Sequence, residues 1–190
     1  MRFFPFPPVR RRGRIAIALL AFALPLAACG PQPVEMFQAA PDALRGAAYV
    51  HAVQLSLGGD SRAAVAEDDR KRHGNGDAGL PFAKLLDTAV KEATRARGLQ
   101  TGRPLIIAVE MDVLRIPDVG MAVLGRSDRL AGQVRVEDAK TGERLALFYV
   151  TVDHPHSGLI GLAMRGGGVR EKLVREFGNR IAEQLAARRR

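Results

Sequence analysis

Two histidines and an aspartate lie close together in the stretch 153–156, which reads DHPH. Imidazole nitrogens and a carboxylate are ligands for zinc or iron, and a metal held in this way supports hydrolysis. Helical zinc pairs place their histidines four residues apart, whereas His154 and His156 are two apart around a proline. We therefore predict no metal site and no catalytic residue, and we name Asp153, His154 and His156 as the residues that would form a metal-dependent hydrolase site.

Two carboxylates, Glu110 and Asp112, alternate with apolar residues in a second stretch. Two residues of strand rise separate them by about 7 Å, a distance compatible with general acid–base work on a sugar. Such work needs a hydrophobic pocket that raises the pKa of one acid, and the surrounding sequence supplies none. We interpret both as acids on the water-exposed face of an antiparallel strand.

The single cysteine, Cys29, ends an apolar stretch near the start of the chain. Basic residues come first, then IAIALLAFALPLAA, and then the cysteine, which is the order of a secretory signal peptide. The apolar stretch, of about 14 residues, is shorter than the 20 or so that a membrane-spanning helix needs. One cysteine also excludes an internal disulfide and a zinc site of paired cysteines.

The residues Leu26-Ala27-Ala28-Cys29 resemble the lipobox of bacterial lipoproteins. The resemblance implies cleavage between Ala28 and Cys29, a diacylglyceryl group on the Cys29 thiol and an N-acyl chain such as palmitate on the new amino terminus. Gly30, which stands where an Asp would imply retention, implies the inner leaflet of the outer membrane, facing the periplasm. We expect no other cofactor. The alternative is an ordinary signal-peptidase site beside an incidental cysteine.

The formal net charge of +9 does not predict a nucleic-acid partner. Five of the arginines precede residue 28 and three form the tail at 188–190, so the body between them is close to neutral. A nucleic-acid interface needs a basic stripe on the folded body, interleaved with aromatic side chains. Aromatic residues make up only 5% of this chain, and we expect no nucleic-acid partner.

Hydropathy patterns divide the chain into a cleaved signal peptide (1–28), a lipidated tether rich in proline and glycine (29–46) and one domain (47–190). Period-two alternation predicts strands, and apolar residues three and four apart predict helices. The charged, glycine-rich segment 58–79 and the segment 154–168 are expected to be loops. The predicted strands are 47–57, 103–116 and a hairpin over 129–154 that turns at DAKTGE; the predicted helices are 80–98 and 169–187.

This element order, β-α-β-β-β-α, predicts an α+β fold. We expect a two-layer sandwich in which two helices pack on one face of a mostly antiparallel four-stranded sheet. The first two strands are joined through a helix, so a parallel pairing with a right-handed crossover is open to them.

A lipobox, one small domain and a hairpin at Val136–Leu145 followed by a C-terminal helix resemble several families of small envelope lipoproteins. The element order over residues 47–187 is similar to that of the TolB N-terminal domain, CsgG and the lipopolysaccharide-assembly lipoprotein. The chain lacks the propeller that follows in TolB, and the resemblance brings no catalytic motif. It implies an architecture, and function needs a separate argument.

Three functions follow from these observations. The first is a non-enzymatic lipoprotein, membrane-bound through its lipid, that acts as an envelope adaptor or assembly factor by contacting an envelope protein. It predicts an exposed apolar patch or a bare strand edge. The second is a lipid or small-molecule carrier, which predicts a large apolar cavity, and the third is the metal-dependent hydrolase. Met121, Val123 and Leu124 are candidates for contact with a partner or membrane; alternatively, they cap the core.

Overall fold

The computed structural model describes residues 34–44, 47–74, 79–155 and 168–186. Most of the chain in these ranges belongs to helices and strands. In chain order these are β1 (Val34–Gln38), the short 3₁₀ helix η1 (Asp42–Leu44), β2 (Ala48–Leu57), α1 (Gly59–Gly74), α2 (Phe82–Ala96), β3 (Arg103–Arg115), α3 (Val119–Val123), β4 (Asp128–Asp138), β5 (Arg144–His154) and α5 (Val169–Leu185).

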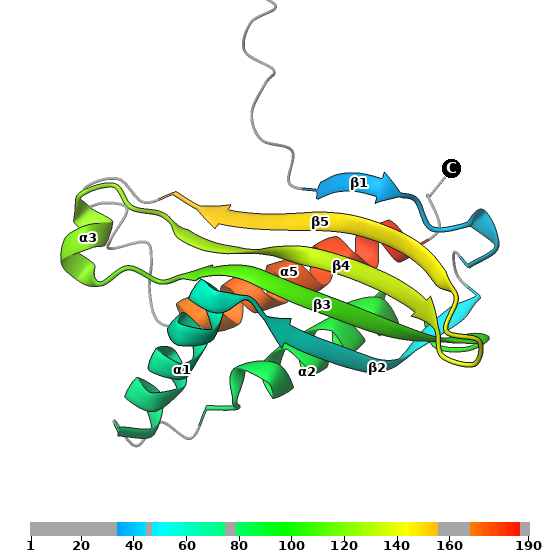
Figure 1. The fold of residues 1–190 in the computed structure, drawn as a ribbon, viewed down its shortest axis with the longest axis horizontal. Helices are drawn as coiled ribbons and strands as arrows, with labels where there is room; N and C mark the ends of the chain where they lie inside the picture. The colour runs from blue at the N-terminus through cyan, green and yellow to red at the C-terminus, as the bar shows by residue number, and fades with distance from the viewer. Residues whose placement is uncertain (1–33, 45–46, 75–78, 156–167, 187–190) are drawn as a thin grey trace, which may run out of the picture. The chain divides into compact units, whose positions relative to one another are not determined.

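One five-stranded sheet has the order β1-β5-β4-β3-β2 (Figure 1). Strands β2 and β3 are parallel, and the other neighbouring pairs are antiparallel. The α+β class and the mostly antiparallel sheet are therefore confirmed, and the parallel pairing that the sequence left open is the one that β2 and β3 adopt. The expected number of strands, four, is wrong, because β1 adds a fifth strand at the edge beside β5.

Strand β1 lies inside the segment 29–46 that the sequence assigned to a tether. It has only five residues, and Pro33 and Pro41 flank it closely, so its local pattern is that of an irregular lead-in. It is ordered by backbone pairing, with Val34 opposite Val150 and Met36 opposite Phe148. The strand is fixed by a partner more than a hundred residues away, which no local pattern reports.

Helices α2 and α5 cover one face of the sheet (Figure 1). The apolar stripe of α2 is buried as predicted, and the same holds for α5. The facing side chains of the central strands complete one hydrophobic core. The largest apolar side chains at its centre are Phe82, Leu86, Leu105, Ile107, Met111, Leu130, Phe148, Leu173, Phe177 and Ile181.

The expected loop at 58–79 is wrong over residues 59–74, which form the helix α1. The segment is polar and has no apolar stripe, so its periodicity does not predict a helix. Tertiary contacts order it instead. The Ser61 hydroxyl is buried and donates to the carbonyls of Gly58 (3.1 Å) and Met111 (2.5 Å), and Val65 enters the core.

The predicted hairpin turn between β4 and β5 is confirmed. Gly142 has φ +74°, the left-handed conformation that favours glycine. The Asp138 carboxylate accepts the backbone N–H groups of Lys140 (2.6 Å) and Thr141 (2.9 Å) and pairs with Arg103 at the start of β3. The hydrogen bond from Arg103, helped by these N–H groups, lowers the pKa of Asp138 to about 2. The turn is therefore attached to the neighbouring strand.

Gly178 of α5 lies where this helix passes closest to α2. A Cβ at this position would be 2.9 Å from the carbonyl oxygen of Ala89. Glycine ordinarily weakens a helix interior, and from sequence alone Gly178 is a weak point of the last helix. In the folded protein it is what lets two backbones approach.

Gly178→Ala is expected to destabilise the protein by about 1–3 kcal/mol, because the added methyl must push α2 and α5 apart. Gly59→Ala is the matched control, since its added Cβ meets nothing within 4 Å. Urea unfolding of both variants measures the difference. A Gly178→Ala protein as stable as the parent would show that the two helices do not need this approach.

Candidate functional site

Asp153 and His154, two of the three residues that would form a metal-dependent hydrolase site, do not converge in the structure. Asp153 and His154 are neighbours on β5, so their side chains point to opposite faces of the sheet. Asp153 is exposed, while His154 lies on the helix side with its Nε2 atom 2.8 Å from Glu176 Oε2. His156 lies outside the described residues. Within the described ranges, no three His, Cys, Asp or Glu side chains are grouped to hold a metal ion.

His154 connects β5 to α5 instead. Glu176 also accepts a hydrogen bond from Arg180 Nη2 at 3.2 Å. Burial raises the pKa of Glu176, but the hydrogen bonds from His154 and Arg180 outweigh it, and the pKa is lowered overall. The carboxylate is therefore held in its charged form by two basic neighbours, as in a structural ion pair.

Glu110 and Asp112 both lie exposed on the face of the sheet that α2 and α5 leave uncovered, as predicted. Glu110 is opposite Gln133, and Asp112 occupies an irregularity between β3 and β4. Burial raises the pKa of Tyr149, and the charge of Asp112 with its hydrogen bond to the phenol raises it further. Asp112 is thus engaged by a tyrosine on the outer face, and both acids stay exposed to solvent.

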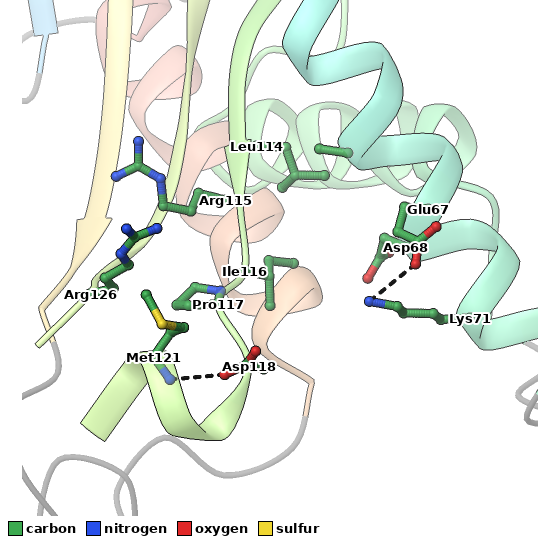
Figure 2. A pocket seen from close by; sticks show the side chains of 11 residues that line it. Glu67, Asp68, Lys71, Leu114, Arg115, Ile116, Pro117, Asp118, Met121 and Arg126 are labelled. Carbon is green, nitrogen blue, oxygen red and sulfur yellow. Dashed lines mark hydrogen bonds and ion pairs between the residues drawn. The ribbon is translucent and has the colours of Figure 1, made fainter. Parts of the chain in front are cut away.

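A cleft of about 430 Å³ lies between α1 and the segment that joins β3 to β4 (Figure 2). Leu114, Ile116 and Pro117 line it from the chain that leaves β3, and Ala64 lines it from α1. Met121 of α3 also borders the cleft. Charged side chains complete the lining: Glu67, Asp68 and Lys71 of α1, and Arg115, Asp118 and Arg126.

The helix α3 falls in the stretch 117–128 that contains the expected contact residues. Asp118 caps it by accepting the Met121 N–H at 2.8 Å. Met121 is half-buried in the cleft, whereas Leu124 is 77% exposed. The side chain of Val123 lies outside the described part of the structure. Of the three candidates, Leu124 thus presents an apolar surface to solvent.

A buried arginine, Arg170, binds Asp68, one of the acids that line this cleft, and the sequence patterns did not predict it. Arg170 begins α5 and is 1% exposed. Its Nη1 atom pairs with Asp68 (2.9 Å) and Asp69 (2.7 Å) of α1, and its Nη2 donates to the Leu80 carbonyl at 2.8 Å. Glu171 adds a contact to Arg72 at 3.1 Å. The sequence signal for this cluster is the pair Asp68 and Asp69 within EDDRKRH. A run of mixed charges of this kind is typical of a solvated segment, so it did not predict a buried ion pair.

The sheet leaves two backbone edges available in the described ranges, β1 and β2. Only Tyr49 of β2 makes a further bridge, to Gln100. On β1, Met36 is 40% and Phe37 55% exposed, so this edge also carries apolar side chains. An unpaired edge with exposed apolar residues is a surface for a further strand or a partner.

No described helix has the length and apolar character needed to cross a membrane. Cys29 and the cleavage position Ala28–Cys29 lie outside the described residues, and lipidation stays a prediction, as does the division into signal peptide, tether and domain.

No protein-family model matches the chain, and no curated protein sequence matches it significantly. Among solved structures, the PelC dodecamer from Paraburkholderia phytofirmans is similar, with a TM-score of 0.53 at 12% identity over 82% of this chain and 98% of that one. A dodecamer of a PelC point variant from the same organism gives 0.51 with the same identity and coverage. A minor lipoprotein from Acinetobacter baumannii gives 0.36 at 13% identity over 72% and 92%. The PelC structures show a shared fold.

Arg170→Met is expected to lower the free energy of unfolding by about 3 kcal/mol, because it removes the buried charge that Asp68 and Asp69 face. Backbone amide hydrogen exchange should become faster throughout α1. Arg70→Met is the control: this arginine also pairs with an acid of α1, Glu67, but is 73% exposed, so the expected loss is below about 0.5 kcal/mol. If the amide protons of α1 exchange as slowly in Arg170→Met as in the parent, Arg170 does not order this helix.

Proposed function

We propose that this protein is a non-enzymatic envelope lipoprotein, held by acyl chains on Cys29 in the inner leaflet of the outer membrane, whose domain assembles with copies of itself. In this role it is a structural component or assembly factor of an envelope complex. The resemblance to a lipobox supports the location. The exposed surfaces of the domain support action by protein contacts.

The observation that carries this proposal is the pair of available sheet edges. β1 and β2 are different edges of one sheet, and β1 adds exposed Met36 and Phe37. A contact between unlike surfaces is head-to-tail, and such contacts close into rings when the rotation permits. The two PelC structures that share this fold are described as dodecamers, which supports the same mode of assembly here.

The two other functions find less support in the described residues. A carrier needs a large apolar cavity, whereas the cleft beside α1 has charged side chains along both walls. A hydrolase built on Asp153 and His154 needs both at one point, and β5 directs them to opposite faces.

Cys29→Ser is expected to release the protein from membranes, because the thiol that carries the diacylglyceryl group is lost. The parent chain should sediment with the outer-membrane fraction and accumulate as an unprocessed precursor after globomycin treatment. Ser56→Ala is a suitable control, since it leaves the lipobox intact. A Cys29→Ser chain that stays in the membrane fraction, with no effect of globomycin on the parent, would contradict lipid anchoring.

Self-assembly is expected for the domain without its lipid. Native mass spectrometry of the Cys29→Ser chain should show a closed homo-oligomer at micromolar concentration. Adding Gln54→Lys and Ser56→Lys places two charges beside the β2 edge and should shift the population to monomers. Ala66→Lys, on the exposed face of α1, should not. A monomeric parent, or an oligomer unaffected by the β2 lysines, would overturn assembly through this edge.

A further inference from the structure

Three arginines gather at the end of the sheet where α3 lies. Arg115 ends β3 and is directly opposite Arg129 of β4 in the strand register. Arg126 precedes β4 and lines the same cleft as Arg115. Figure 2 shows the guanidinium groups of Arg115 and Arg126 turned away from Glu67 and Asp68 of α1. We call Arg115, Arg126 and Arg129 the arginine group.

The acids around the cleft are already engaged. Glu67 pairs with Arg70 and Lys71, and Asp68 pairs with the buried Arg170. Asp118 uses a carboxylate oxygen to accept the N–H of Met121 in α3. Glu67 and Asp68 are thus paired with other basic groups, and none of these three acids pairs with a member of the arginine group in the described residues.

The arginine group, by contrast, makes no side-chain hydrogen bond or ion pair with any described residue. The Nε atom of Arg129 is buried and has no hydrogen-bond partner there. Three acids are near. Asp60 of α1 and Asp112 line one surface hollow with Arg115, and Asp153 is directly opposite Arg129 in the strand register. Asp112 accepts a hydrogen bond from the Tyr149 phenol, which also lies in the electric field of Arg129. Arg115 and Arg129 are like charges directly opposite each other, which destabilises a sheet, and Asp153 offsets this on the β5 side only, so an anionic ligand would lower the remaining electrostatic cost.

An exposed apolar residue, Leu124, precedes Arg126 by two positions in the chain. Leu124, at the end of α3, is 77% exposed, the most exposed of the large apolar side chains in the described ranges. Basic side chains next to an exposed leucine match an anionic bilayer surface, where the charges meet headgroups and the leucine enters the acyl boundary.

Strand β1 begins toward this end of the sheet. β1 begins at Val34 opposite Val150 and runs antiparallel to β5, so the chain enters from the end that holds His154, Asp128 and α3. From Val150 to His154 is about 14 Å of strand. Five residue steps join Cys29 to Val34, a reach of at most about 17 Å. Acyl chains on Cys29 would therefore start at most this far from the beginning of β1.

We propose that the arginine group and Leu124 form a docking surface for anionic phospholipid headgroups in the membrane that holds the anchor. The orientation it gives rests on the proposed lipidation of Cys29; the binding itself rests on the described side chains. Docking fixes the domain with its α3 end on the bilayer and leaves the edges β1 and β2 to run away from the membrane.

Vesicle binding of the unlipidated Cys29→Ser chain tests this surface. The chain should sediment with vesicles of equal parts phosphatidylglycerol and phosphatidylcholine, release at high salt, and ignore pure phosphatidylcholine. Replacing Arg115 and Arg126 by Gln should weaken binding about fivefold for each arginine removed. Leu124→Ser should weaken it further. Arg95→Gln with Arg175→Gln, two exposed arginines on α2 and α5, is the matched control and should bind as the parent does.

Several outcomes would overturn the proposal. One is equal binding by the parent and the Arg115/Arg126 variant, when circular dichroism shows both to be folded. Another is release of the parent by millimolar inorganic phosphate, which would identify a soluble phosphate site in place of a membrane surface. Because the chain carries no lipid, this result is independent of the globomycin and fractionation experiment. Failure of either proposal can therefore be told from failure of the other.

Discussion

The described chain has two long amphipathic helices with which to cover a five-stranded sheet, and this constraint governs the rest of the structure. Helices α2 and α5 cover only one face, so the buried apolar side chains of the strands gather on that side. They fit beside each other because Gly178 lets α5 approach the backbone of α2 at Ala89. The opposite face and the two sheet edges are left for solvent or for partners.

Helix α1 depends on a different interaction, because it has no apolar stripe to bury. A single buried guanidinium, that of Arg170, connects Asp68 and Asp69 to the start of α5 and to the chain entering α2. An ion pair of this kind is weak evidence for stability, but it specifies one position for the helix. That position creates the cleft against the segment after β3 and engages one of the cleft's acids, leaving Arg115 and Arg126 without a partner from α1.

In the proposed role the protein acts through its surfaces. The residues with recognisable chemistry are used structurally: His154 pairs with Glu176, and Asp138 stabilises a turn with Arg103. Three kinds of surface remain available to a partner or a membrane in the described residues. They are the backbone edges of β1 and β2, the exposed apolar side chains on β1 and at the end of α3, and the arginine group. If the lipid on Cys29 holds the α3 end at the membrane, the same domain can present its edges to further copies without competition between the two contacts.

Local patterns predicted both long helices, four of the five strands and the β4–β5 turn, because each has its own periodicity or a glycine at a left-handed position. They also predicted that Glu110 and Asp112 lie on the water-exposed face. Strand β1 and helix α1 were not predictable in this way, since distant partners, Phe148 for one and Arg170 for the other, order segments whose own pattern is that of a loop. The candidate site was partly visible: Leu124 was named from its apolar stretch, while the arginine group was not.

The sequence by itself determined the class of fold and the helix faces that are buried, and it predicts lipid attachment at Cys29, because these are read from neighbouring residues. Only the tertiary structure decided that Asp153 and His154 separate, that Arg115 comes to lie opposite Arg129, and that a polar segment becomes a helix. The physical reason is that strand register and buried charge pairing join residues far apart in the chain, and the strength of such contacts appears only once the chain is folded.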